Sequence, residues 1–140
     1  MPSMNIIEVK HKNRILAIIF KHSLKSGGVR FLTPNEYTLQ LGLLEHPAGT
    51  IVRDHAHNHK IHYNVDTTQE FIYLESGQVL VKIFTDNFKL VKKVKLCPGD
   101  FILHIAGGHG FEILEKCRMI EVKQGPYPGD KLAKIFKDSI

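Results

Sequence analysis

Short apolar runs divided by turn residues dominate this sequence, and they limit the possible folds more than any other feature. The runs are rich in β-branched or aromatic side chains, and the clearest are residues 14–20, 69–75, 78–85 and 88–96. Turn signals such as Asp86-Asn87 separate them. Runs of this length, punctuated in this way, are typical of strands in a barrel or sandwich. We therefore predict an all-β fold.

Weaker patterns fill in the rest of the predicted fold. Further strands are expected over residues 4–9, 36–45, 101–105, 111–114 and 118–123. The tail, residues 129–140, has the apolar spacing of one short helix. With 140 residues, of which 43% are hydrophobic, the chain suits one domain over residues 1–140 with one sizeable core. N-terminal strands are placed within residues 4–20.

Composition excludes several classes of protein. The apolar run Ile15–Phe20 is far shorter than the about 20 residues of a membrane span. Arg14 and Lys21 bracket it too closely for the core of a signal peptide. We therefore expect a cytoplasmic protein with no membrane partner. Cys97 and Cys117 match no zinc motif and are predicted to be buried or half-buried free thiols.

The charge balance favours an anionic small molecule over a nucleic acid. The 19 basic and 14 acidic residues give a formal net charge of +5. The lysines are dispersed, and the one tight cluster, Lys92, Lys93 and Lys95, fits the solvent-facing side of an edge strand. No nucleic-acid-binding motif accompanies it.

Histidines gather in the stretch from Gly49 to Gly77, which contains four of the nine. In an extended strand, His55, His57 and His59 would share one face, with neighbours roughly 6.6 Å apart. Two adjacent imidazoles can reach one metal ion, but the outer two cannot. The ligand pair is therefore His55 with His57, or His57 with His59.

Glu70 begins an apolar run in which Ile72 and Leu74 share its face. A carboxylate among apolar side chains is costly unless it is paired or binds a metal. The alternative is that Glu70 faces solvent while Phe71 and Tyr73 face inward. Alternation leaves both orientations of Glu70 open, because both faces of its predicted strand are apolar.

A second cluster follows the turn Pro98-Gly99-Asp100. Gly107-Gly108 allows a sharp bend before His109, which opens a strand with apolar neighbours. His104 is the rival histidine, but it precedes the bend. A lone histidine at an apolar strand start is more often structural than a ligand.

Together these two clusters resemble the motifs of the cupin superfamily. In the first, Gly49 is followed after five residues by His55-Ala-His57, and Glu70 after six residues by Gly77. The second contains the Pro-Gly-Asp turn, the glycine-rich bend and His109. The gap of twelve residues between His57 and Glu70 exceeds the three or four usual in the family. The resemblance covers about residues 36–124 and implies that the core barrel spans them.

The resemblance implies a cupin-type double-stranded β-helix, which is a jelly-roll barrel, in a small single-domain bacterial cupin. It also implies a homodimer and one divalent metal ion bound inside the barrel. The implied metal ligands are His55, His57, Glu70 and His109, with His59 as the alternative ligand. Three imidazoles and one carboxylate suit Fe, Mn, Ni, Co or Zn and leave positions for substrate.

These implications predict a metal-dependent enzyme of the isomerase, epimerase or dioxygenase type. Its substrate would be a small polar molecule, anionic and similar to a sugar or a keto acid. The candidate substrate-binding residues are Arg53, Gln69, Tyr73 and Lys123, and no catalytic residue is assigned. Arg53 and Lys123 can bind a carboxylate or phosphate if they face inward. The alternative is a non-catalytic binding or sensory cupin, because fold does not fix function.

Overall fold

The computed structural model describes residues 4–139 and consists mostly of β-strands, with 45% strand and 4% helix. The prediction of a β-rich fold is therefore confirmed. The chain divides into two compact units. The first unit combines the N-terminal residues up to Leu24 with the residues from Thr68 onward, and the second is Lys25–Thr67.

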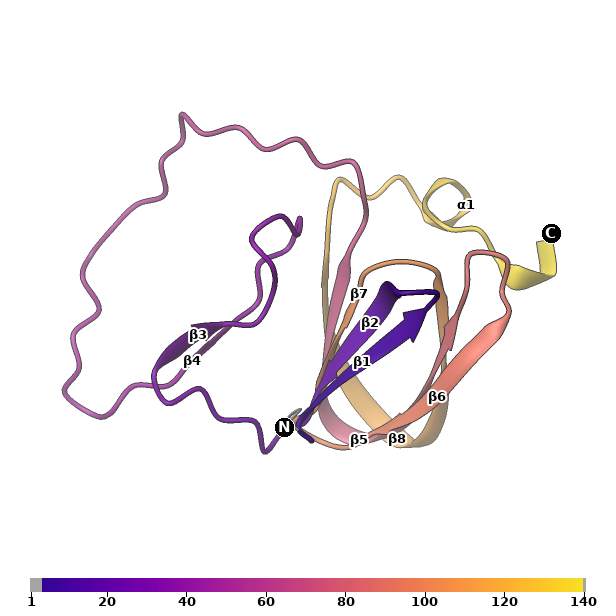
Figure 1. Cartoon of the computed structure of the whole chain (residues 1–140), viewed down its shortest axis with the longest axis horizontal. Coiled ribbons are helices and arrows are strands. Elements are labelled where there is room, and N and C mark those ends of the chain that lie inside the picture. The colour runs from indigo at the N-terminus through magenta and orange to yellow at the C-terminus, as the bar shows by residue number, and fades with distance from the viewer. Residues whose placement is uncertain (1–3, 140) are drawn as a thin grey trace. The chain divides into compact units, whose positions relative to one another are not determined.

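The first unit contains one curled antiparallel sheet (Figure 1). Its strands follow the order β1-β2-β7-β5-β6, and β8 pairs with β5 on the side opposite β7 and β6. The strands are β1 (Ile6–His11), β2 (Arg14–Phe20), β5 (Glu70–Phe84), β6 (Leu90–Leu96), β7 (Phe101–His104) and β8 (Gly108–Lys123). The sheet forms a half-barrel.

The hairpin of β1 and β2 follows from its two-residue turn. Lys12 and Asn13 both have positive φ, at 50° and 66°. Two such residues make the type of turn that matches the twist of paired strands. β2 then runs through the interior, and its last five residues, Leu16–Phe20, are all buried.

β5 is one continuous strand of 15 residues, whereas the sequence predicted two strands around Ser76-Gly77. Its pairing with β8 instead shifts register three times between Leu74 and Val79. Gly77 lies in this segment with φ +86°, and a Cβ there would lie 2.2 Å from the carbonyl oxygen of Lys116. Such β-bulges bend a strand and increase its twist, which curls the sheet.

The inward face of the curled sheet holds the hydrophobic core. Alternate residues of β5, including Ile72, Leu74, Val79 and Val81, are at most 4% exposed. They pack with Leu16, Ala17, Ile19, Ile83, Leu96 and Ile102. This packing fixes which face of β5 is inward, and it is the face that also carries Glu70.

A buried carboxylate ties β2 to the turn between β6 and β7. The side chain of Asp100 is fully buried. It accepts hydrogen bonds from Lys21 Nζ at 2.6 Å and from the backbone N–H groups of His22 and Cys97 at 2.8 and 2.9 Å. Because β7 starts one residue later, these bonds fix the start of the strand that carries His104.

The second unit contains the hairpin of β3 (Val29–Phe31) and β4 (Gly42–Leu44). The strand predicted over residues 36–45 is therefore too long, because of these residues only Gly42–Leu44 pair with β3. A hydrogen-bonded turn from Pro34 to Tyr37 and the contacts of Gln40 with the carbonyls of Pro34 and Tyr37 shape the residues before it. Residues 50–59, expected to be extended, form no strand.

The tail forms the predicted short helix, α1 (Asp130–Ala133), followed by the 3₁₀ turn Lys137–Ser139. Within residues 4–139 neither helical segment has the length and hydropathy needed to cross a membrane. Cys97 and Cys117 are half-buried free thiols, as predicted.

Candidate metal centre

Glu70 is the first residue of β5 and lies on its inward face. Ile72 and Leu74 on the same face are 4% and 0% exposed, which resolves the ambiguity left by alternation. The Glu70 side chain is 14% exposed. In the sheet register it lies between His104 of β7 and Lys123 of β8. Glu70 is therefore a carboxylate at the rim of the core, with basic side chains on both neighbouring strands.

His104 ends β7 and is almost completely buried, with 5% of its surface exposed. Its ring stacks on that of His109, with ring centroids 3.7 Å apart and an interplanar angle of 16°. Phe111 contacts both rings edge-on, at 6.0 and 5.9 Å between centroids. The two imidazoles are thus held by ring packing.

The short connection from β7 to β8 brings His109 back to His104. The backbone N–H groups of Ile105 and Ala106 donate to the carbonyl oxygen of Leu16 at 2.9 and 3.2 Å. Gly107 then turns the chain with φ +71°, where a Cβ would lie 2.2 Å from the carbonyl oxygen of Phe84. Only glycine fits this close approach.

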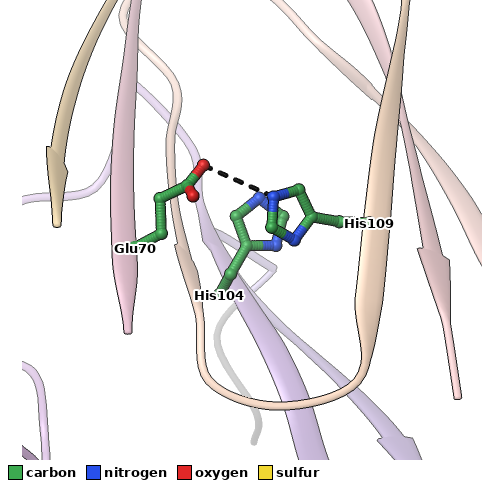
Figure 2. Close-up of side chains that lie close together, drawn as sticks. All are labelled: Glu70, His104 and His109. Carbon is green, nitrogen blue, oxygen red and sulfur yellow. Dashed lines mark ion pairs between the residues drawn. The ribbon is translucent and has the colours of Figure 1, made fainter. Parts of the chain in front are cut away.

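The three side chains converge from three strands, as Figure 2 shows. One donor atom from each of Glu70, His104 and His109 lies within 4.8 Å of the others. The Oε1 atom of Glu70 is 3.4 Å from Nε2 of His109. One carboxylate oxygen and two imidazole nitrogens in this arrangement can hold a metal ion.

The electrostatics of the cluster keep Glu70 and His104 in the forms that bind metals. Burial raises the pKa of Glu70, but the hydrogen bond and charge of His109, the charge of His104 and a hydrogen bond with Glu121 outweigh it and lower the pKa to about 2. Burial, reinforced by His109, lowers the pKa of His104 to about 3 although Glu70 opposes this. At neutral pH, Glu70 is therefore a carboxylate and His104 a neutral imidazole.

The buried Nε2 atom of His104 shows whether the residues of this cluster fit a metal ion. Among the buried side-chain polar atoms of residues 4–139, only Nε2 of His104 has no hydrogen-bond partner. Leaving a buried polar atom unbonded costs about 1–3 kcal/mol. A metal ion coordinated by that nitrogen would remove this cost, and the neighbouring carboxylate and second imidazole complete a donor set. The residues present therefore fit a divalent transition metal.

The predicted histidine ligands lie in both compact units, and His109 is the one that belongs to the first unit. His55, His57 and His59 are exposed side chains of the unit Lys25–Thr67. The Nδ1 atom of His55 is 2.8 Å from the carbonyl oxygen of Arg53, and the His55 and His57 rings are 5.7 Å apart. Arg53 is also exposed there. That His55 with His57, or His57 with His59, binds a metal ion stays a prediction.

Of the other predicted substrate-binding residues, Gln69 and Lys123 lie next to Glu70, whereas Tyr73 faces away from it. Gln69 is 4% exposed, and its backbone N–H donates to Oε1 of Gln124 at 2.5 Å, which joins the start of β5 to the residue after β8. Tyr73 lies on the face of β5 opposite Glu70. Lys123 shares the face of Glu70, directly opposite it on β8.

His104 was not among the predicted ligands, because it precedes the glycine bend in the sequence. The local pattern holds no clear signal for it, because Ile102 and Leu103 lie on opposite faces of Phe101–His104 and are both fully buried. The bend brings the two rings together.

No protein-family model, curated protein or solved structure matches this chain.

Proposed function

We propose that this protein binds one divalent transition metal ion through Glu70, His104 and His109, and that the ion binds a small polar molecule at its remaining positions. The observation that carries the proposal is the buried, unbonded Nε2 of His104 beside a carboxylate and a second imidazole. Two histidines and one carboxylate are the protein ligands of many iron(II) oxygenases and of several catalytic zinc sites.

We further propose that the site is catalytic. Three protein ligands leave open coordination positions, which distinguishes a catalytic from a structural site. A bound ion would act as a Lewis acid on a carbonyl or enediol oxygen, or would bind O₂ if it is iron. The chain's own residues contribute the rest: Glu70 supplies negative charge, His104 and the core exclude water from one side, and the β7–β8 connection positions His109.

The wider architecture is part of the proposal. The half-barrel is compatible with a cupin-type double-stranded β-helix and with a homodimer of two chains. The supporting features are the sequence motifs together with the inward-facing Glu70 and the clustered His109. An isomerase or dioxygenase acting on a sugar-like or keto-acid-like anion follows from the same proposal.

Metal binding is tested by stripping the purified protein with a chelator and reloading it separately with Fe(II), Mn(II), Co(II), Ni(II) and Zn(II). Elemental analysis after desalting should give one ion per chain for at least one metal. Glu70→Gln and His104→Ala should abolish this binding, whereas His46→Ala, at an exposed histidine, should not. No bound metal in the unsubstituted protein would overturn the proposal. His57→Ala tests the predicted further ligand by its effect on affinity.

Catalysis is tested on the metal-loaded protein with a panel of keto acids, sugar acids and sugar nucleotides. Turnover that disappears in Glu70→Gln would support an enzyme. Metal-dependent ligand binding without turnover of any panel member would instead support the non-catalytic binding protein.

A further inference from the structure

Lys123 lies beside the candidate metal centre in the same row of the sheet. In the β5–β8 register it is directly opposite Glu70, and on the other side of Glu70 β7 carries His104. Directly opposite residues of antiparallel strands share a face, with Cβ atoms about 4.5–5.5 Å apart. An imidazole, a carboxylate and an ammonium group therefore form one row across three adjacent strands, on the inward face.

The surroundings hold the Lys123 side chain while leaving its ammonium group able to bind. The side chain is 24% exposed, and its Nζ lies 4.7 Å from the centroid of the Tyr127 ring. The Tyr127 hydroxyl donates to Asp130, which fixes the ring. Among residues 4–139, the ion pair of Lys123 is with Oε1 of Glu121 at 3.5 Å. This distance exceeds that of a normal hydrogen bond, so the three ammonium donors are available.

Charge then determines what the site attracts. Oε1 of Glu121 lies 3.5 Å from Nζ of Lys123. A divalent ion together with the carboxylates of Glu70 and Glu121 is electrically neutral, and coordinating histidines are neutral as well. The ammonium group of Lys123 adds one positive charge in excess. A bound metal would therefore leave this row positive, which favours an anionic ligand.

We propose that Lys123 binds a carboxylate or phosphate group of the molecule whose other end occupies the open positions of the metal ion. This inference rests on the proposed function and specifies its substrate class: a small acid with a metal-binding oxygen group at one end and an anion at the other. Lys123 is then a specificity-determining residue, because its charge selects anionic over neutral molecules of the same chelating type.

The test uses the full-length protein loaded with Co(II), whose visible absorption responds to added chelators. Acetohydroxamate probes the metal alone, whereas succinate monohydroxamate adds a carboxylate and phosphoglycolohydroxamate adds a phosphate. Lys123→Met should keep Co(II) stoichiometry and acetohydroxamate affinity, and should lose at least about tenfold in affinity for one or both anionic probes, as expected for a charge-assisted hydrogen bond. The probe that loses more identifies the anion.

Two further variants separate charge from packing. Lys123→Arg should retain most of the preference for anionic probes, and Lys116→Met, at an exposed lysine of the same strand, should leave all three affinities unchanged. Equal affinities for the anionic probes in the unsubstituted protein and in Lys123→Met would overturn the inference while leaving metal binding intact. Failure of the unsubstituted protein to bind Co(II) or any other metal would overturn the proposed function and this inference together. If Lys123→Met does not fold, Lys123→Gln is measured in the same way.

Discussion

Glu70 and His109 belong to opposite ends of the β5–β8 ladder, yet Oε1 of Glu70 lies 3.4 Å from Nε2 of His109. The strand partner of His109 is Ile83, thirteen residues along β5 from Glu70. In a straight strand that separation would be roughly 40 Å. The cluster therefore depends on the curl of β5, which its β-bulges and Gly77 produce.

Gly77→Ala should disrupt the curl and, with it, metal binding. The added Cβ would lie 2.2 Å from the carbonyl oxygen of Lys116, at a φ of +86°. We expect a loss of more than about 2 kcal/mol in the free energy of unfolding, from strain and from displaced backbone. Urea denaturation measures it. Gly27→Ala is the control, because Gly27 has a similar φ of +66° but nothing within 4 Å. Equal losses in the two variants would contradict this account of the curl.

His104→Leu should stabilise the metal-free protein while abolishing metal binding. Leucine keeps the apolar packing at this 5% exposed position and removes the unbonded Nε2. Removing such a buried polar atom should increase the free energy of unfolding by about 1 kcal/mol. Urea denaturation in the presence of a chelator tests stability, and elemental analysis tests binding. A metal-free variant less stable than the parent protein would show that the imidazole has a structural role.

Acidification should destabilise the metal-free protein in two stages. The folded-state pKa values of His104 and Glu70, about 3 and about 2, lie below their ordinary values of 6.5 and 4.5. The unfolded chain therefore binds more protons, and stability falls as pH falls, first below 6.5 through His104 and then below 4.5 through Glu70. Between pH 7 and pH 5, His104 should lower the free energy of unfolding by about 2 kcal/mol.

Urea denaturation at pH 7 and pH 5 checks this prediction, with His104→Leu as the comparison. Between pH 7 and pH 5 the free energy of unfolding should fall by about 2 kcal/mol less in the variant than in the parent protein. The same pH dependence in both proteins would assign the effect to other histidines.

Asp100→Asn should be far more destabilising than a matched change at an exposed ion pair. The buried Asp100 carboxylate pairs with Lys21, and burial, which raises its pKa, is outweighed by the hydrogen bonds from Lys21, Cys97 and His22, which lower it. Breaking a buried pair costs about 3–5 kcal/mol, whereas an exposed pair contributes about 0–1 kcal/mol. Asp86→Asn, which breaks the exposed pair with Arg14, is the control. Similar midpoint temperatures of thermal unfolding in the two variants would contradict the structural role given to Asp100.

Much of the fold follows from local pattern, since the predicted strands over residues 14–20, 88–96 and 101–105 closely match β2, β6 and β7. The continuity of β5 was not predictable from local pattern, because Ser76-Gly77 is a turn signal, whereas pairing with β8 on both sides of it makes a bulge. Residues 36–45 likewise alternate as a strand does, but a strand also needs a partner, and only Gly42–Leu44 have one.

The candidate site was predictable in part. Glu70 and His109 were predicted as metal ligands through the family resemblance, and the structure brings them together with His104. Alternation could not orient Glu70, because both faces of its strand are apolar, and the burial of Ile72 and Leu74 in the folded sheet decides it. His104 was missed because the sequence shows a bend between His104 and His109 but does not show whether the two rings then lie apart or stack on each other.

The distance in sequence between the donors has a consequence for how the chain acquires an ion. His104 and His109 are joined by four residues and can meet as soon as their short connection closes, whereas Glu70 precedes His104 by 34 residues. Contacts of that separation form late, because loop-closure entropy must be overcome first. If the proposed ion is bound, a partly folded chain would offer it only the two imidazoles. All three donors would come together only in the finished tertiary structure, and a partly folded chain would exchange its ion rapidly.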